Sequence, residues 1–242
     1  MRKTIIDNNY QKIFFVHIKK TAGTSINATF INFDRTNYNS ENWNENGRYL
    51  KFINNDTITV DNKILTSSKF KIKKADYFYA TSHEPFYKYK FSKNTFTFTC
   101  FRDTFKRWLS FYKECFKYKK NNAKHPIRNK TDRLLGKSFF EFTTNCKKNL
   151  KSDLLNQIYM FSPNYNIKDA LKNINKLSYY FFVEDFNNGI KFLSENLNLP
   201  LKSIHVRKND FDVEYTKEEK NEIMDMLKLE YQLLDQLKNG VL

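Results

Sequence analysis

The sequence predicts an α/β fold in which a central, mainly parallel sheet lies between two layers of helices, a three-layer α/β/α arrangement. Short apolar runs of strand length alternate with segments whose apolar residues recur at helical spacing. This alternation is typical of a parallel sheet covered on both faces. The chain of 242 residues is 40% hydrophobic and 17% aromatic, which excludes wholesale disorder and is enough for a ring-rich core.

Four apolar runs are expected to form strands: KIFFVHI (12–18), ADYFYATS (75–82), TFTFTCF (95–101) and YYFFVE (179–184). The third run is the clearest, because β-branched and aromatic residues fill it. The second run stops before Pro85, which disfavours continuation of the strand. Residues 34–68 are rich in asparagine, and the runs YLKFI and ITV, separated by NND, fit a hairpin.

Helical spacing follows the first and the third predicted strands. Ile26, Phe30 and Phe33 recur at this spacing after the first strand. After the third strand, apolar residues of 105–116 fall at i, i+3, i+4 and i+7, which gives a helix with one apolar face. Further helical patterns occupy 138–146, 167–175, 187–197 and 217–238, whereas 117–137 is expected to be a basic loop.

Composition and charge predict the domain organisation of the chain and the kind of partner that it binds. We expect a polar lead-in over 1–11 and a single domain over 12–242. The net charge of +16 favours anionic partners. No apolar run approaches the roughly 20 residues of a membrane helix, and the N-terminus lacks a secretory signal, so we expect a cytoplasmic protein. The spacing of Cys100, Cys115 and Cys146 indicates buried thiols, with neither a disulfide framework nor a metal cluster.

The turn KKTAGTS (19–25), placed between a strand and a helix, predicts an anion site. Its backbone N–H groups and the helix dipole favour negative charge. Gly23 allows close approach of the backbone, and Lys20 adds a full charge. Thr24 and Ser25 add hydroxyl donors. The lysine precedes the glycine, so the ordinary P-loop pattern GxxxxGK[ST] is absent, and a well-capped helix without a ligand is the alternative.

Two motifs give the chain a resemblance to a known family. FFVHIKKTAGTS resembles the 5′-phosphosulfate loop of the carbohydrate sulfotransferases, whose usual form is close to hIPKTGGTS. TFTCFRDTFKRWLSFY is similar to the second signature of that family, a strand followed by RDPxxRxxSxY. The likeness extends weakly from about Lys12 to Leu237, and within the family it points to the heparan sulfate 2-O- and 6-O-sulfotransferases.

The resemblance implies a P-loop NTPase-like domain that moves a sulfuryl group from 3′-phosphoadenosine 5′-phosphosulfate (PAPS) to an acceptor hydroxyl, with no metal required. The loop lysine, here Lys20, would neutralise charge on the departing phosphate. The residues that would bind the 5′-phosphate, mostly through their backbone, are Thr21, Ala22, Gly23, Thr24 and Ser25. Lys19 replaces the family's proline and is expected to be a solvated surface lysine.

The second motif concerns the 3′-phosphate. Arg102 stands where a predicted strand ends, at the sheet edge where open α/β sheets bind ligands, and a guanidinium can bind a phosphate through two N–H groups. By resemblance, Arg102 and Ser110 hold the 3′-phosphate. Asp103 is expected to cap the following helix, and Arg107 is expected to pair with Asp103 at i, i+4 in a structural role.

His83 is the candidate general base, because an acceptor hydroxyl is a poor nucleophile until its proton is taken. It ends a predicted strand at the same sheet edge as the loop, and the family often carries a histidine or an acidic base in this region. Glu84 is the alternative base. His17 alternates with Ile13 and Phe15, which indicates a core histidine with a satisfied hydrogen bond.

The segment 86–93 and the loop 117–137 mix aromatic residues with lysines. Rings can stack on sugar faces and lysines can hold acidic groups, so the segment 86–93, which directly follows His83, is expected to bind the acceptor. The resemblance implies a carbohydrate-type acceptor, with a precursor glycan, a lipid-linked sugar, a small molecule, tyrosine or another alcohol left open. The same composition suits single-stranded nucleic acid or a plain solvated surface. No stable nucleic-acid partner is expected.

Two other functions remain open at this point. The first is a P-loop-type nucleotide kinase or ATPase, in which the acidic end of FFVED would hold magnesium, although the lysine spacing opposes it. The second is a nucleic-acid-binding protein driven by the positive charge of the chain, whose binding would fall steeply with salt.

Overall fold

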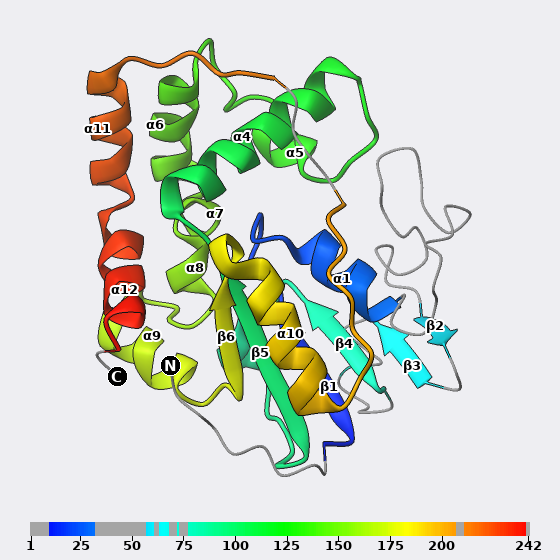
Figure 1. Ribbon diagram of the computed structural model, residues 1–242. Coiled ribbons are helices and arrows are strands. Elements are labelled where there is room, and N and C mark those ends of the chain that lie inside the picture. Colours follow the sequence, from blue (N-terminus) through cyan, green and yellow to red (C-terminus); the bar gives the residue numbers. More distant parts are fainter. Residues whose placement is uncertain are drawn as a thin grey trace. The chain divides into compact units, whose positions relative to one another are not determined.

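The computed structural model describes residues 10–31, 57–60, 63–67, 72, 77–206 and 211–240 (Figure 1). The chain forms two compact units. The first unit comprises the described residues of 1–101 and 173–207, and the second unit those of 102–172 and 208–242. The first unit holds the sheet and the second is helical. Only Tyr10 and Gln11 of the predicted lead-in lie among the described residues.

The described part of the first unit contains a six-stranded sheet with the order β2-β3-β4-β1-β5-β6. The strands are β1 (Lys12–Val16), β2 (Thr57–Val60), β3 (Lys63–Thr66), β4 (Tyr79–Ser82), β5 (Thr95–Phe101) and β6 (Tyr179–Phe182). β2 runs antiparallel to β3, and the other neighbouring strands are parallel. This confirms the predicted α/β class with a central, mainly parallel sheet and flanking helices, and it is consistent with a three-layer α/β/α fold.

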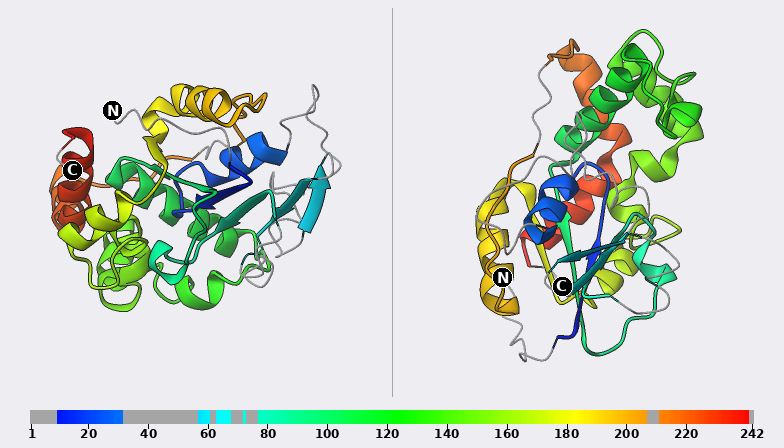
Figure 2. Two further views of the ribbon diagram at one scale, coloured as in Figure 1. Left: turned by 90° about the horizontal axis from the view of Figure 1, so that it is seen from below. Right: turned by 90° about the vertical axis from the view of Figure 1, so that its right-hand side faces the viewer.

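Two helices of the first unit, α1 (Gly23–Ile31) and α10 (Phe186–Leu197), cover the same face of the sheet (Figure 2). Apolar side chains of both helices share one buried core with the strands. The ring of Phe15 stacks on Phe98 at 5.0 Å, and Phe30 of α1 lies 5.7 Å from Phe98. Successive residues of a strand face opposite sides, so alternate residues of β1 and β5 carry this core.

The segment between β4 and β5 packs against the opposite face. It begins with a 3₁₀ turn, η2 (Phe86–Lys88). Phe14 alternates with the α1-facing residues of β1, and its ring lies 4.9 Å from Tyr89 and 4.7 Å from Phe91. The aromatic residues of this segment therefore serve first as packing groups.

β1 occupies the position from which the candidate site is built. It lies between β4 and β5 and pairs in parallel with both, and Phe14, Phe15 and Val16 are fully buried. Burial on both faces explains the unbroken apolar run of the sequence. The strands that follow β1 in the chain, β2 to β4, lie on one side of it in the sheet, whereas β5 and β6 lie on its other side. The strand order therefore reverses between β1 and β5. Open α/β sheets bind ligands beyond the carboxyl ends of strands at such a reversal.

The second unit is built from helices around a ring-rich core. The helices are α4 (Thr104–Lys120), α5 (Arg128–Thr131), α6 (Phe139–Asn149), α7 (Lys151–Leu154), α8 (Asn156–Tyr159), α11 (Lys217–Met226) and α12 (Lys228–Lys238), with α9 (Ile167–Ile174) leading into the first unit. Trp108 stacks on Phe111 and Phe142 at 5.1 and 5.3 Å. Its indole N–H donates to Thr143 at 2.8 Å, which satisfies its one buried donor.

Some helix boundaries differ from the prediction. α4 continues to Lys120, inside the predicted loop 117–137, because basic residues in a last turn are favourable at the negative end of the helix dipole. The predicted helix 217–238 is two helices, with the break at Leu227. The short helix α5 also lies inside the predicted loop 117–137, and α7 and α8 were not expected at all.

The predicted hairpin is only partly described. ITV falls in β2, which pairs with β3, the strand that follows it. YLKFI lies outside the described residues. None of the described helices has the length and apolar character that would let it cross a membrane.

Candidate active site

The loop between β1 and α1 has an alternating backbone conformation. Lys20 and Ala22 are left-handed, with φ of 69° and 59°, whereas Thr21 between them is not, and Gly23 begins α1. Alternation of this kind turns successive N–H groups toward one concave side, which is an anion-binding geometry. The Thr21 hydroxyl donates to the Ile18 carbonyl at 2.9 Å and is buried, so Thr21 can serve an anion only through its backbone.

The start of α1 adds donors to this concavity. The first N–H groups of a helix have no partner within it, and the dipole places about half a positive charge there. Ser25 accepts the Val206 N–H at 3.1 Å through its Oγ, a bond that does not use the hydroxyl hydrogen. Thr29 donates to the Lys202 carbonyl at 3.2 Å. The segment leading to Val206 is thus bonded along α1, beside the loop.

Gly23 packs directly on a histidine ring. A Cβ at this position would lie 1.6 Å from Nε2 of His17, so no side chain fits without displacement of the ring. The His17 ring cannot move easily, because it stacks on Phe15 at 5.0 Å and lies 4.0 Å from the ring of His83. The glycine is therefore required by packing within the first unit, a reason that the sequence did not reveal.

His17 is neutral in the folded protein near pH 7. Burial lowers its pKa well below 6.5, and the positive charges of His83, Lys20 and Lys19 lower it further. The part of the chain that the structure describes offers its ring nitrogens no hydrogen bond, so the expected satisfied histidine is not seen there. Lys19 is half-buried, which differs from the expected solvated lysine.

His83 is exposed at the end of β4, and the backbone of His17 holds it. Its Nδ1 lies 2.8 Å from the His17 carbonyl oxygen. A carbonyl can only accept, so Nδ1 carries the hydrogen and Nε2 carries the lone pair of the neutral ring. This is the tautomer of a general base that acts through Nε2. The carboxylate of Glu84, the alternative base, forms an ion pair with Lys88 at 3.0 Å.

Arg102 and Ser110 belong to the second unit, whereas the loop 19–25 and His83 belong to the first. Arg102 directly follows β5, and its backbone N–H donates to Oε1 of Gln157 at 2.9 Å. Asp103 caps α4 as predicted, with Oδ1 accepting from a backbone N–H at 2.8 Å. Arg102 and Ser110 are both half-buried.

The predicted pairing of Arg107 with Asp103 is wrong. Arg107 is fully buried, and its guanidinium pairs with Glu230 at 3.2 Å. A buried guanidinium needs a buried counter-charge, and the carboxylate of Asp103 is already engaged as the helix cap. The structural role expected for Arg107 stands, but with a partner from α12.

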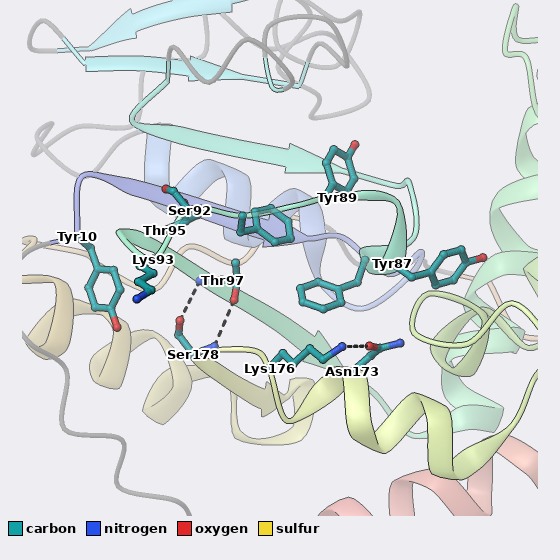
Figure 3. Close-up of a pocket in the computed structure, with 12 residues that line it drawn as sticks. Tyr10, Tyr87, Tyr89, Ser92, Lys93, Thr95, Thr97, Asn173, Lys176 and Ser178 are labelled. Carbon is teal, nitrogen blue, oxygen red and sulfur yellow. Dashed lines mark hydrogen bonds between the residues drawn. The ribbon is translucent and has the colours of Figure 1, made fainter.

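A pocket of about 460 Å³ lies in the first unit, on the face of the sheet that α1 and α10 leave uncovered (Figure 3). It is lined by Tyr10, Phe86, Tyr87, Tyr89, Phe91, Ser92, Lys93, Thr95, Thr97, Asn173, Lys176 and Ser178. Figure 3 shows Tyr10 and Lys93 at one end and Tyr87 at the other. The predicted acceptor segment 86–93 supplies much of this lining, with Lys93 and Ser92 beside aromatic rings.

Sequence reasoning missed Gln157 and Glu230 and undervalued His17. The signal for Glu230 was a carboxylate placed among the inward residues of the C-terminal helix. Among the described residues, no group of three or more His, Cys, Asp or Glu side chains could hold a metal ion. The three cysteines are buried and free.

The chain matches a known family over nearly its whole length. The Sulfotransferase family matches residues 2–238. No curated protein matches the chain.

Neighbouring substitutions in the loop should change stability in opposite directions. Gly23→Ala forces a methyl group onto the His17 ring, so we expect a loss of about 1–3 kcal/mol in the free energy of unfolding. Ala22→Gly relieves a left-handed alanine, so we expect a gain of about 1 kcal/mol. Chemical denaturation measures both, and equal effects of the two changes would contradict the loop conformation.

His17 should make stability fall in mild acid. Its folded pKa lies below 6.5, so its contribution is full above pH 6.5 and is lost as the pH falls, because the unfolded chain takes up a proton that the folded chain refuses. We expect His17→Gln to flatten the decline between pH 7 and pH 5.5, which can reach about 1.4 kcal/mol per pH unit. His205→Gln, at an exposed site, is the control. Parallel curves for wild type and His17→Gln would count against a half-buried, neutral His17.

Proposed function

Because the chain belongs to the sulfotransferase family, its chemistry is sulfuryl transfer, and we propose that the donor is PAPS and the acceptor a hydroxyl of a carbohydrate. The observation that carries this proposal is the concave turn of left-handed Lys20 and Ala22 that leads into α1. PAPS supplies an activated sulfuryl group on a 5′-phosphate and carries a second phosphate at the 3′ position. Its two anionic ends match the two sets of residues that the motifs single out.

The loop would hold the 5′-phosphate end of the donor. Transfer needs in-line geometry and stabilisation of negative charge on the equatorial and leaving oxygens. Backbone N–H groups from Thr21 to Ser25, including those of Ala22, Gly23 and Thr24, supply fixed donors. The hydroxyls of Thr24 and Ser25 add two more, and Lys20 supplies the full positive charge beside them. These groups are placed before the reaction, so little reorganisation is needed when charge develops.

Arg102 and Ser110 would hold the 3′-phosphate. A guanidinium at the start of a helix adds two parallel N–H donors to the positive end of the dipole. The Asp103 cap keeps the carboxylate turned to the helix backbone, at 2.8 Å from the Lys106 nitrogen. This limits the repulsion that a carboxylate next to Arg102 would otherwise exert on a phosphate.

His83 would remove the proton from the acceptor hydroxyl. Its hydrogen bond to the His17 carbonyl keeps the proton on Nδ1 and the lone pair on Nε2. When Nε2 takes up a proton, the Nδ1–H bond to the carbonyl strengthens and stabilises the charged ring. The neutral state of His17 supports this role, because a second charged imidazole 4.0 Å away would oppose protonation of His83.

The pocket between residues 86–95 and 173–178 supports a sugar-type acceptor. Aromatic rings suit the apolar faces of sugars, and Lys93 with Lys176 suits acidic substituents. Phe86 and Tyr87 follow the base by a few residues in the chain, so the same segment would bind the sugar units beyond the reacting hydroxyl.

Donor binding separates this function from an ATP-dependent one. We expect adenosine 3′,5′-bisphosphate to stabilise the protein strongly in a thermal-shift assay, and ATP with Mg²⁺ to stabilise it little. Arg102→Ala should raise the dissociation constant of the bisphosphate about tenfold to a hundredfold, since hydrogen bonds to charged groups contribute about 1.5–3 kcal/mol. Lys20→Ala should also weaken binding.

The control is Lys191→Ala, because Lys191 is exposed on α10 and pairs only distantly with Glu195 at 3.9 Å. It removes the same charge as Lys20→Ala and should leave affinity unchanged. Stabilisation by ATP with Mg²⁺ alone, or equal losses for Lys20→Ala and Lys191→Ala, would overturn the proposed donor site.

His83→Ala should keep bisphosphate affinity and lower turnover about 10²- to 10⁴-fold, the usual contribution of a positioned base. Turnover is measured as transfer of labelled sulfate from PAPS to a panel of glycans. His205→Ala is the matched control and should leave turnover unchanged. Normal turnover of His83→Ala would move the base role to Glu84, which Glu84→Gln then tests; no transfer to any glycan would reject the carbohydrate acceptor.

A further inference from the structure

A fully buried ion pair lies under the start of α4 in the second unit. Arg107 of α4 and Glu230 of α12 have no exposed surface. The guanidinium reaches Oε2 of Glu230 through Nε at 3.3 Å and through Nη2 at 3.2 Å. It also donates to the carbonyls of Asp153, at 3.2 Å, and of Leu154. Both charges are thus hydrogen-bonded on several sides.

Gln157 connects this ion pair to Arg102. Its backbone N–H donates to Oε1 of Glu230 at 2.6 Å, and its side-chain Nε2 donates to Oε2 at 3.1 Å. A carboxylate can only accept, so the amide nitrogen must face Glu230 and the amide oxygen must face the other way. That oxygen accepts the backbone N–H of Arg102 at 2.9 Å. The orientation of Gln157 is therefore fixed at both ends.

Stability alone does not explain this arrangement. Burial raises the pKa of Glu230, and Arg107 and Gln157 act against that rise, so much of the attraction offsets desolvation. Well-packed apolar residues often replace buried ion pairs without loss of stability. What the chain of contacts does achieve is a fixed backbone position at Arg102, where β5 ends and α4 begins.

We propose that Gln157 and Glu230, with Arg107, are positioning residues that hold the Arg102 backbone so that its guanidinium meets the 3′-phosphate of the donor. The inference rests on the proposed function. Bidentate binding of a phosphate demands closely defined geometry, and a side chain can be placed no more accurately than the backbone that carries it. Gln157 acts on the nucleotide only through Arg102.

Gln157→Met tests the proposal, because methionine has a similar length and volume but its side chain can neither accept from the Arg102 N–H nor donate to Oε2 of Glu230. The backbone N–H of residue 157 keeps its bond to Oε1 of Glu230. We expect the dissociation constant of adenosine 3′,5′-bisphosphate, measured by calorimetry on the full chain, to rise about tenfold. Adenosine 5′-monophosphate lacks the 3′-phosphate, and its affinity should change less than twofold. Gln157→Asn, which keeps the amide but is too short to span both partners, should give the same selective loss and guards against a folding defect in the first variant.

Gln232→Met is the matched control, since Gln232 is exposed on α12, two residues from Glu230. It should leave both affinities unchanged. In the Arg102→Ala background, Gln157→Met should have no further effect on bisphosphate binding, because the guanidinium that it positions is gone.

The outcomes separate this inference from the proposed function. Equal losses for the two nucleotides, additive effects of Gln157→Met and Arg102→Ala, or no loss at all would overturn the positioning role while the donor site stands. A wild-type protein that binds the bisphosphate no better than the monophosphate would overturn the donor assignment itself.

Discussion

The contact between Gly23 and the His17 imidazole is the constraint on which the candidate site depends. β1 is buried and paired on both sides, so the chain must turn as soon as the strand ends. Left-handed residues at Lys20 and Ala22 bring α1 down onto the His17 ring, where no Cβ fits. The same His17 holds His83 through its carbonyl. The Gly23–His17 contact therefore fixes where the first N–H groups of α1 lie. The backbone of the same His17 fixes the orientation of the histidine proposed as base.

The fold was predictable where local pattern and burial agree. β5 coincides with the predicted run 95–101, and the strand–loop–helix order around Gly23 followed from residue types alone. The conformation of Ala22 was not predictable, because alanine rarely adopts a left-handed backbone and nothing nearby in the sequence marks it. The break at Leu227 was hidden because buried leucines continue the helical spacing across it.

The candidate site also has a part that was predictable from the sequence and a part that was not. The loop is local, so Lys20 to Ser25 could be named from the sequence. The surroundings of Arg102 are not local, because Arg107 meets Glu230 across 123 residues and Gln157 meets Glu230 across 73. The i, i+4 spacing predicted an ion pair between Arg107 and Asp103, the opposite charge nearest to it in the sequence. It failed because the N-cap already uses that carboxylate, and because a buried guanidinium is stable only beside a buried partner.

The two proposed anion-binding elements use different donors: backbone N–H groups in the loop 19–25, and the side chain of Arg102. The proposed nucleotide donor explains the difference. Backbone N–H groups would bind the 5′-phosphate, a group common to many nucleotides, and such donors tolerate Ala22 in place of the family's glycine. Discrimination must then come from the 3′-phosphate, which Arg102 would read. A discriminating contact fails if its donor can shift to suit another ligand. The fully buried Gln157, held by Glu230 and through it by Arg107, fixes the backbone of Arg102, where selection between nucleotides would be made.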